Sequence, residues 1–508
     1  MGRRFSLHIE FVATSFSIES HSVLPDAPVI GVAQADVPAQ ARDRSYLICA
    51  VLGCAALAAV CILDEWAVAF LILLILLVVP PVLELRAGRF DLLGLQTLFS
   101  IGYFLNFVMS TLYSLYIAPR FLDLESFRST LPYVLTVCSI GLLLFHIGFY
   151  SPLGKALAKV FPKVSDQWTS RGVIITTAVF LVVGVICFVE MMAQAGGFEN
   201  FEANLYNVNE LLLGNYYLNE LARGLLLYAF FVSYLWARAK RRWIAEAASY
   251  VILTAILVAF AATGSSGTVV LLLLSSVFVV RYLSHWSRRD SAFIVAAALL
   301  FVFVMPIYRV YRNLQAMNLD AAELVSAAIE ERNSAEFIPL IFRRFYGVES
   351  LTLIIDKVGK TTELRHPGDI FLSIPREFIP RGLWPEKPYG VGFQFIETFL
   401  PKEFGDRLVA GPPTLVGELY WNLFLPGVIL GMFAVGVIAR CGNDWFASNR
   451  GMFGLAVYFP LANLFFAINE GAVASRMANE MAPYLMAALI AELIMRLTKG
   501  TASLSTPA

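Results

Sequence analysis

The side chains best suited to chemistry are basic residues set between two long apolar stretches, in the segment 309–412. Guanidinium groups stay charged at any working pH and bind pairs of phosphate or carboxylate oxygens through parallel hydrogen bonds. So many cations beside apolar sequence predict the binding of an anionic ligand. The alternative is that they anchor lipid headgroups or pair with nearby acids. The basic residues are Arg309, Arg312, Arg343, Arg344, Arg376, Arg381 and Lys387, and the acids are Asp369, Glu377 and Glu386.

Four further residues are candidate catalytic acids or bases. A positioned imidazole or carboxylate can take the proton of a reacting hydroxyl group. The histidine is the only one in the segment 309–412, and an exposed loop histidine without a role is the alternative for it. One of the glutamates lies in an apolar stretch, where an ionisable group is costly and is by default a functional candidate. The four candidates are His366, Asp369, Glu349 and Glu418.

The stretch 374–388 alternates prolines with basic and aromatic residues. Proline fixes φ and disfavours helix in the residue before it, so we expect a stiff, extended segment that holds its basic side chains in place. Trp384 within it offers a flat face to a sugar ring. Arg476 lies with Glu470 at the end of a later apolar stretch, where it is a further candidate contact for the same ligand.

The elements that must position these residues are membrane helices. The chain is 58% hydrophobic and 15% charged, with a mean hydropathy of +0.70. Apolar windows of about 20 residues recur along it, and each is long enough to cross a hydrocarbon core of about 30 Å. Only helices satisfy every backbone group in such windows, since a barrel would show short alternating segments. We therefore predict an all-α polytopic membrane protein with about twelve transmembrane helices. The expected spans are 45–63, 66–83, 92–116, 132–150, 172–193, 220–237, 249–263, 267–283, 291–308, 413–439, 452–470 and 482–497.

Loop charges orient the chain. Lys and Arg gather in the loops on the side of the N-terminus, while the short loops of the other side hold only Arg120, Arg128 and Arg476. The positive-inside rule then makes both termini cytoplasmic and the long basic segment exoplasmic. The predicted parts are a cytoplasmic tail 1–44, helices over 45–308, a large exoplasmic loop 309–412, helices over 413–497 and a tail 498–508.

Several classes of function are excluded or disfavoured. The formal net charge is zero, whereas nucleic-acid binders carry a basic footprint. None of the six cysteines lies in 309–412, which excludes a disulfide-stapled exterior domain. The histidines and cysteines show no ligand spacing, so we predict no metal site and no cofactor. There is also no P-loop or Gly-rich dinucleotide motif, so the energy for an exoplasmic reaction must come with the substrate.

The stretch 374–388, with its Pro-Arg and Trp-Pro-x-Lys-Pro elements, resembles the outer loop of bacterial Wzy-type O-antigen, or oligosaccharide repeat-unit, polymerases. The segment 413–431 resembles the span that follows this loop in the family, and the loop Gly196-Gly197-Phe198 and the twelve-span layout also fit. Relatives carry Asn-Phe-Gly after the Gly-Glu element, whereas this chain has Asn422-Leu423-Phe424.

The resemblance implies a glycosyltransferase of the GT-C type in the bacterial inner membrane. It would polymerise undecaprenyl-diphosphate-linked oligosaccharides into O-antigen of lipopolysaccharide or a related polysaccharide, transferring the nascent chain to a new lipid-linked unit with release of lipid diphosphate. The basic residues, Trp384 and Arg476 would contact diphosphate or glycan, and one of the four catalytic candidates would deprotonate the acceptor. The implied partners are the lipid-linked oligosaccharide, membrane lipids and a chain-length regulator protein.

Two alternatives stay open. An O-antigen ligase would use the same lipid donor but pass the glycan to a lipid A core. A transporter of lipid-linked oligosaccharides is the alternative from another class, although the two halves of the chain show no inverted repeat and alternating access needs no large one-sided loop.

Overall fold

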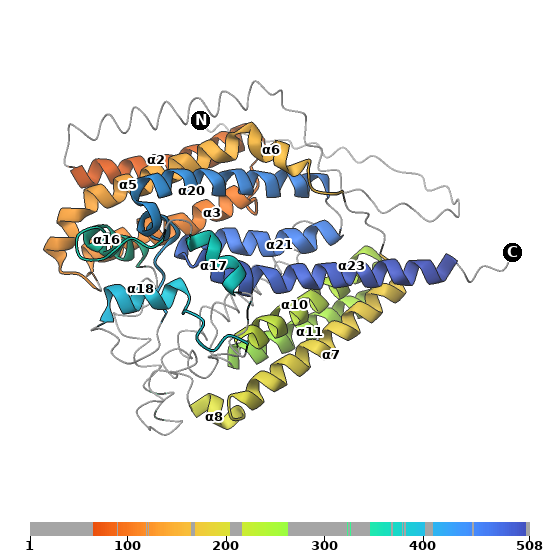
Figure 1. The fold of residues 1–508 in the computed structure, drawn as a ribbon. Helices are drawn as coiled ribbons and strands as arrows, with labels where there is room; N and C mark the ends of the chain where they lie inside the picture. The colour runs from red at the N-terminus through yellow and green to blue at the C-terminus, as the bar shows by residue number, and fades with distance from the viewer. Residues whose placement is uncertain are drawn as a thin grey trace, which may run out of the picture. The chain divides into compact units, whose positions relative to one another are not determined.

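The computed structural model describes a chain of helices (Figure 1). Within the described residues, the one pairing of extended backbone is an isolated bridge between Val358 and Thr362. The residues that the structure describes are 65–88, 90–117, 119, 121–163, 168–203, 216–262, 323, 326, 346–366, 369–377, 379, 383–401, 410–449 and 452–503. All of them belong to one compact unit, 35–508.

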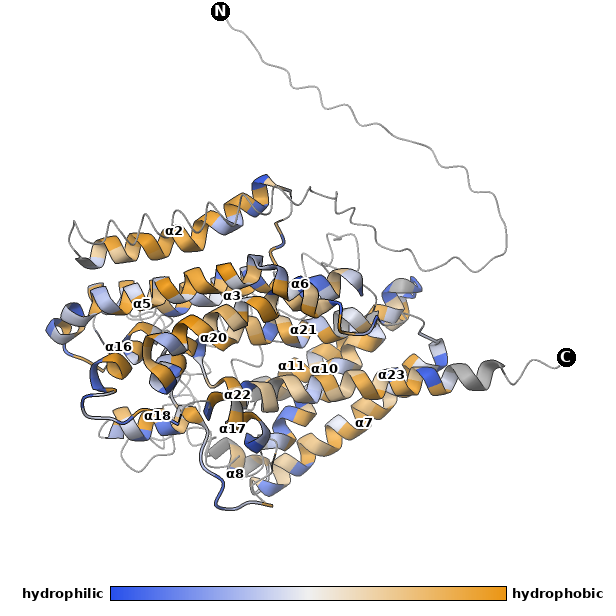
Figure 2. Ribbon diagram, turned by 45° about the horizontal axis from the view of Figure 1, so that its top comes forward, coloured by the Kyte–Doolittle hydropathy of each residue, from blue (hydrophilic) through white to orange (hydrophobic). Residues whose placement is uncertain are grey.

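Seven helical segments of the described chain are long and apolar enough to cross a membrane. Hydrophobic residues predominate along them, as Figure 2 shows for α2 and α7. The prediction of an all-α polytopic membrane protein is confirmed at this level. The segments are α2 (Glu65–Arg86), α3–η1–α4 (Leu95–Tyr103, Phe104–Met109 and Ser110–Tyr116), α5 (Leu124–Tyr150), α7 (Ser170–Gln194), α11 (Trp243–Ala262), α20 (Leu415–Ser448) and α22–η4–α23 (Val473–Ser475, Arg476–Met481 and Ala482–Ser503).

Two more helices coincide with predicted spans but fall outside these seven. They are α10 (Tyr216–Ala239) and α21 (Met452–Ala467), the second being only 16 residues long. The predicted spans 45–63, 267–283 and 291–308 lie outside the described residues, so the number of twelve stays a prediction. The remaining named elements are α6 (Pro152–Ala158), α8 (Phe198–Ala203), α16 (Gly347–Lys357), α17 (Asp369–Glu377), α18 (Val391–Phe399) and η3 (Ile468–Glu470).

Glycines allow α20 to pack closely against α5, its neighbour in Figure 1. A Cβ at Gly148 would lie 2.1 Å from the carbonyl oxygen of Phe433, and a Cβ at Gly436 would lie 2.1 Å from that of Phe145. Small residues bring membrane helices together in this way, because in lipid their association depends on close packing. α5 and α20 thus form a tightly packed pair of helices.

A break divides α20 into two helices. Leu423 has φ −147° and ψ 25°, and Phe424 has φ 52° and ψ −144°. Pro426 explains the position, because it has no N–H for the carbonyl of Asn422 and its ring would collide with that carbonyl. The conformation of Phe424 is one that glycine adopts without strain. Its ring packs edge-on against Tyr420, 5.6 Å between centres, which offsets part of that strain.

The predicted extended segment 374–388 is helical in its first part, so that prediction was wrong there. α17 continues through Glu377 with Pro375 in its last turn. A helix of nine residues loses only one internal hydrogen bond to this proline, and α17 packs against α22 and η4. Residues 384–387 turn instead of extending, since Lys387 N donates to Trp384 O over 3.0 Å.

The two ends of the bundle differ in charge. One end gathers α16 and the starts of α5 and α20, where Phe121 N donates to Glu349 Oε2 (3.0 Å) and Thr414 N to Glu470 O (3.1 Å). The opposite end joins the start of α7 to the end of α23. The basic residues of the described spans and loops at that opposite end are Arg86, Lys155, Lys159, Lys163, Arg171, Arg238, Lys240, Arg241, Arg242, Arg440, Arg496 and Lys499.

This arrangement predicts that cysteines introduced at positions 360 and 240 are accessible from opposite sides of the membrane. Lys360 is 66% exposed after α16, and Lys240 is exposed after α10. A membrane-impermeant maleimide applied to intact cells, with the six native cysteines replaced, is expected to label position 360 and to label 240 only after permeabilisation. Labelling of both positions in intact cells would contradict the topology.

Candidate functional site

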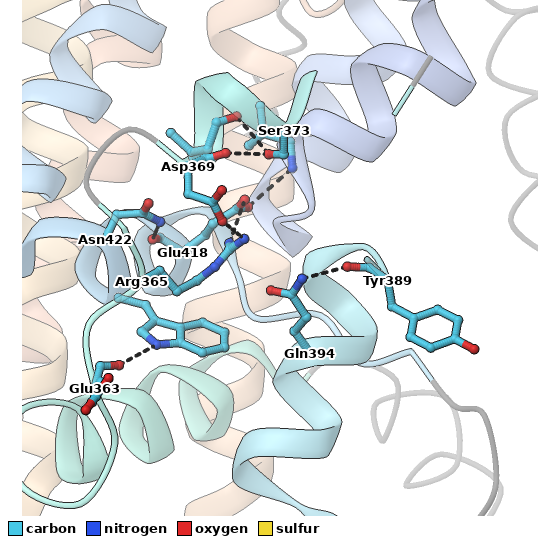
Figure 3. A network of polar contacts seen from close by, with 11 residues as sticks. Glu363, Arg365, Asp369, Ser373, Tyr389, Gln394, Glu418 and Asn422 are labelled. Carbon is cyan, nitrogen blue, oxygen red and sulfur yellow. Dashed lines mark hydrogen bonds and ion pairs between the residues drawn. The ribbon is translucent and has the colours of Figure 1, made fainter. Parts of the chain in front are cut away.

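A buried arginine, Arg365, lies between two carboxylates at the start of α20 (Figure 3). Its Nη2 pairs with Asp369, and its Nη1 lies 3.9 Å from Oε1 of Glu418. The arginine side chain is only 7% exposed. A charge removed from water to this degree is stable only when it is paired, so the two acids are needed where they stand.

Trp421 fixes the position of this arginine. Arg365 N donates to Trp421 O over 3.1 Å, and the guanidinium lies 5.4 Å from the centre of the indole ring. The indole Nε1 donates in turn to Glu363 O over 3.2 Å. The carbonyl of Trp421 accepts from Arg365 at the point where α20 breaks, since helix-end carbonyls need partners outside the helix. Cation–π attraction adds to the hold on the guanidinium.

Glu418 joins two membrane-spanning segments. It lies in the first turn of α20 with 1% of its side chain exposed, and its Oε2 accepts from Val473 N, the first residue of α22, over 3.3 Å. An ionisable group this deeply buried at a membrane-spanning segment is a functional candidate.

The backbone around this junction has unusual conformations. Thr414, Gly471 and Ala472 all have positive φ, at 63°, 85° and 57°. Only glycine tolerates the middle position, because a Cβ there would lie 2.8 Å from the carbonyl carbon of Thr414. Strained residues of this kind persist where the surrounding structure holds them, and they concentrate at functional sites.

Asp369 is the more exposed acid of this cluster. It is the first residue of α17, its side chain is 24% exposed, and its backbone carbonyl accepts from Ser373 Oγ over 2.5 Å. His366 is exposed on the turn before α17, where its carbonyl accepts from Asp369 N over 2.9 Å. Two of the predicted catalytic residues, Asp369 and Glu418, therefore meet around Arg365.

Two predicted ligand contacts are instead engaged with acids of the protein. The Nζ of Lys387 has three acceptors: Oε2 of Glu377 at 3.1 Å, its carbonyl at 3.0 Å and that of Ile379 at 3.2 Å. Arg476 donates to Glu470 Oε2 over 2.6 Å and to Gly471 O over 3.0 Å. The pairing alternative left open by the sequence is thus realised at Lys387.

Arg376 and Trp384 are the other two predicted contacts that lie in the described part of the chain. Arg376 lies in the last turn of α17, and its buried Nε has no hydrogen-bond partner among the described residues. Trp384 is 37% exposed. The predicted contacts Arg309, Arg312, Arg343, Arg344 and Arg381 lie outside the described residues and stay predictions.

Glu349 makes its contacts away from Arg365. It is fully buried in α16, where Oε1 accepts from Ser114 Oγ over 2.6 Å and Oε2 from Phe121 N over 3.0 Å. These bonds tie α16 to α4 and to the turn before α5, which gives Glu349 a structural role. Within the described chain, no group of three His, Cys, Asp or Glu side chains is placed to hold a metal ion.

Sequence reasoning did not assign Arg365 or Trp421 to the site. The available signal for Arg365 was its place four residues before Asp369, close enough in the chain for an ion pair across the turn that precedes α17. No protein-family model, curated protein or solved structure matches the chain. Function must therefore be argued from the residues and their geometry.

The contacts of Glu349 generate a stability prediction. Glu349→Ala leaves the hydroxyl of Ser114 and the N–H of Phe121 without their acceptor, which costs about 1–3 kcal/mol for each buried group left unpaired. The thermal midpoint of the purified protein in detergent, followed by size-exclusion chromatography of heated samples, is expected to fall. Asp356→Ala is the control, because Asp356 is 54% exposed on the same helix. Equal midpoints for the two variants would contradict the structural role.

Proposed function

We propose that the protein is an integral-membrane glycosyltransferase that polymerises undecaprenyl-diphosphate-linked oligosaccharides at the outer face of the bacterial inner membrane. The observation that supports it best is the buried Arg365 held between Asp369 and Glu418 where membrane-spanning segments begin. The likeness of the stretches 374–388 and 413–431 to the Wzy-type polymerases agrees with this chemistry. The basic residues at the opposite end of the spans support the exoplasmic position of the site.

The charges of the described cluster suit an uncharged sugar. Lys387 and Arg476 are balanced by their own glutamates, and Arg365 by two acids. A diphosphate needs an excess of positive charge, which this cluster lacks. We therefore assign the acceptor glycan to the surroundings of Arg365 and Asp369. The lipid diphosphate is assigned to Arg376 with Arg309, Arg312, Arg343, Arg344 and Arg381.

Asp369 is the proposed general base. Its carboxylate is the more exposed of the two, whereas the carboxylate of Glu418 accepts from Val473 N and faces Arg365, so Asp369 is better placed to take a proton. Arg365 orients the carboxylate through their ion pair. Asp369 takes the proton of the acceptor hydroxyl, whose oxygen bonds to the anomeric carbon of the donor glycan. The bond from that carbon to the diphosphate oxygen breaks, and the lipid diphosphate leaves with the electron pair.

The first test of this function needs a single substrate. Purified protein given only lipid-diphosphate-linked repeat units is expected to produce a ladder of longer lipid-linked chains and to release free lipid diphosphate, because one molecule serves as donor and acceptor. Electrophoresis and mass spectrometry of the lipid-linked products provide the measurement. A ladder that forms only after a lipid A core is added indicates a ligase. Movement of the lipid across a vesicle membrane without a change in glycan length indicates a transporter.

A second prediction concerns the residues of the site. Asp369→Asn is expected to slow ladder formation by about 10²–10⁴-fold, the usual contribution of a general base. Arg365→Lys is expected to lose most activity as well, because an ammonium cannot bridge two carboxylates while lying flat on an indole. Lys360→Ala, in an exposed ion pair on the same end of the bundle, is the matched control. Wild-type rates in Asp369→Asn would remove this residue from the mechanism.

A further inference from the structure

Asn422 presents a buried oxygen without a partner. It is the last residue of α20 before the break, and its Nδ2 donates to Glu418 O over 2.7 Å. A carbonyl oxygen can only accept, so the amide must face it with nitrogen and point its Oδ1 elsewhere. The side chain is 3% exposed, yet Oδ1 has no hydrogen-bond partner among the described residues. Such an atom in a native protein calls for an explanation.

Arg365, which pairs with Asp369 and Glu418, also has a buried polar atom without a hydrogen-bond partner among the described residues. Arg365 Nη1 is buried and has no hydrogen-bond partner in the described part of the chain, and its 3.9 Å distance to Glu418 Oε1 is too long for one. Its backbone N–H is bound to Trp421, the residue before Asn422. Other buried polar atoms lack partners, Asn469 Oδ1 among them. Asn422 differs in standing one helical turn from a proposed site carboxylate, as Figure 3 shows.

We propose that Asn422 Oδ1 and Arg365 Nη1 bind the acceptor sugar, the oxygen accepting from one hydroxyl group and the nitrogen donating to a sugar oxygen. This inference rests on the proposed function and specifies which side chains select the acceptor. An anion is disfavoured because Oδ1 and Glu418 both repel it, and a cation is disfavoured by the guanidinium of Arg365. A neutral ligand that carries donors and acceptors, as a carbohydrate does, satisfies both atoms.

The break in α20 supports a ligand at this point. A discontinuous helix at membrane depth is tolerated where it is covered by protein or lines a cavity, and substrate sites form at such breaks. Here the break at Leu423 and Phe424 directly follows Asn422. The first part of the helix therefore ends at Asn422, whose Oδ1 has no hydrogen-bond donor among the described residues.

The test compares Asn422→Leu with Asn449→Leu. Leucine has a similar volume and removes the unpaired oxygen, so the thermal midpoint without substrate is expected to stay near the wild-type value. Asn449 is the matched control, because its Nδ2 also donates to the carbonyl four residues before it (Trp445, 2.8 Å), at the far end of the same helix. The probe is the lipid-diphosphate-linked repeat unit extracted from producing cells that lack this protein.

Two quantities are measured: the shift of the thermal midpoint with repeat-unit concentration, and KM and kcat for ladder formation. Asn422→Leu is expected to raise the apparent Kd and KM about 10- to 100-fold, with a smaller effect on kcat, and Asn449→Leu to leave both unchanged. Unchanged Kd and KM in Asn422→Leu overturn the proposal, whether or not the midpoint falls. Stabilisation of wild type without a ladder refutes the polymerase function while leaving the sugar contact standing. Absence of any stabilisation of wild type overturns both.

Discussion

The structure around the candidate site depends on one requirement. The positive charge of Arg365 is buried, so it must be balanced by acidic side chains of the protein. Removing one partner of a buried ion pair costs about 3–5 kcal/mol, so the acids around it cannot be exchanged freely. Asp369 and Glu418 come from different segments, α17 and α20, and Trp421 completes the enclosure. The same bonds that neutralise the arginine therefore fix α17 against the membrane-spanning helix. The ion pairs of Arg365 therefore both stabilise the packing of α17 and fix the position of Asp369, the proposed base.

A second constraint comes from Pro426, which interrupts α20 inside an apolar span. In lipid an interrupted helix must find partners for its free backbone groups. The carbonyl of Trp421 finds one in Arg365 N. The break that Pro426 causes thus exposes a backbone acceptor to which the main chain of Arg365 binds.

The helices were predictable because their signal is local. Hydropathy alone placed the spans 66–83, 92–116 and 172–193 within a few residues of α2, α3–η1–α4 and α7. α5 begins before the predicted 132 because Asp123 caps it, accepting from Ser126 N over 2.8 Å. The site was only partly predictable. The sequence shows that a residue is basic, but it does not show whether the fold places an acid beside it. Lys387 and Arg476 carry such acids, and Arg365 gains its role from Trp421, 56 positions away.

Charge balance also explains how a carboxylate base can work near an anionic leaving group. Two unit charges 6 Å apart repel by about 3 kcal/mol at an effective dielectric constant of 20. Asp369 and Glu418 would both add to this repulsion if they stood alone. Arg365, placed between them, offsets one of these charges. We therefore propose two separate roles. Arg365, paired with Asp369 and Glu418, holds the neutral acceptor beside the base, and arginines without acidic partners bind the diphosphate. The ion pairs of Arg365 are the observation behind the first part of this proposal, and the basic residues of the segment 309–412 are the sequence feature behind the second.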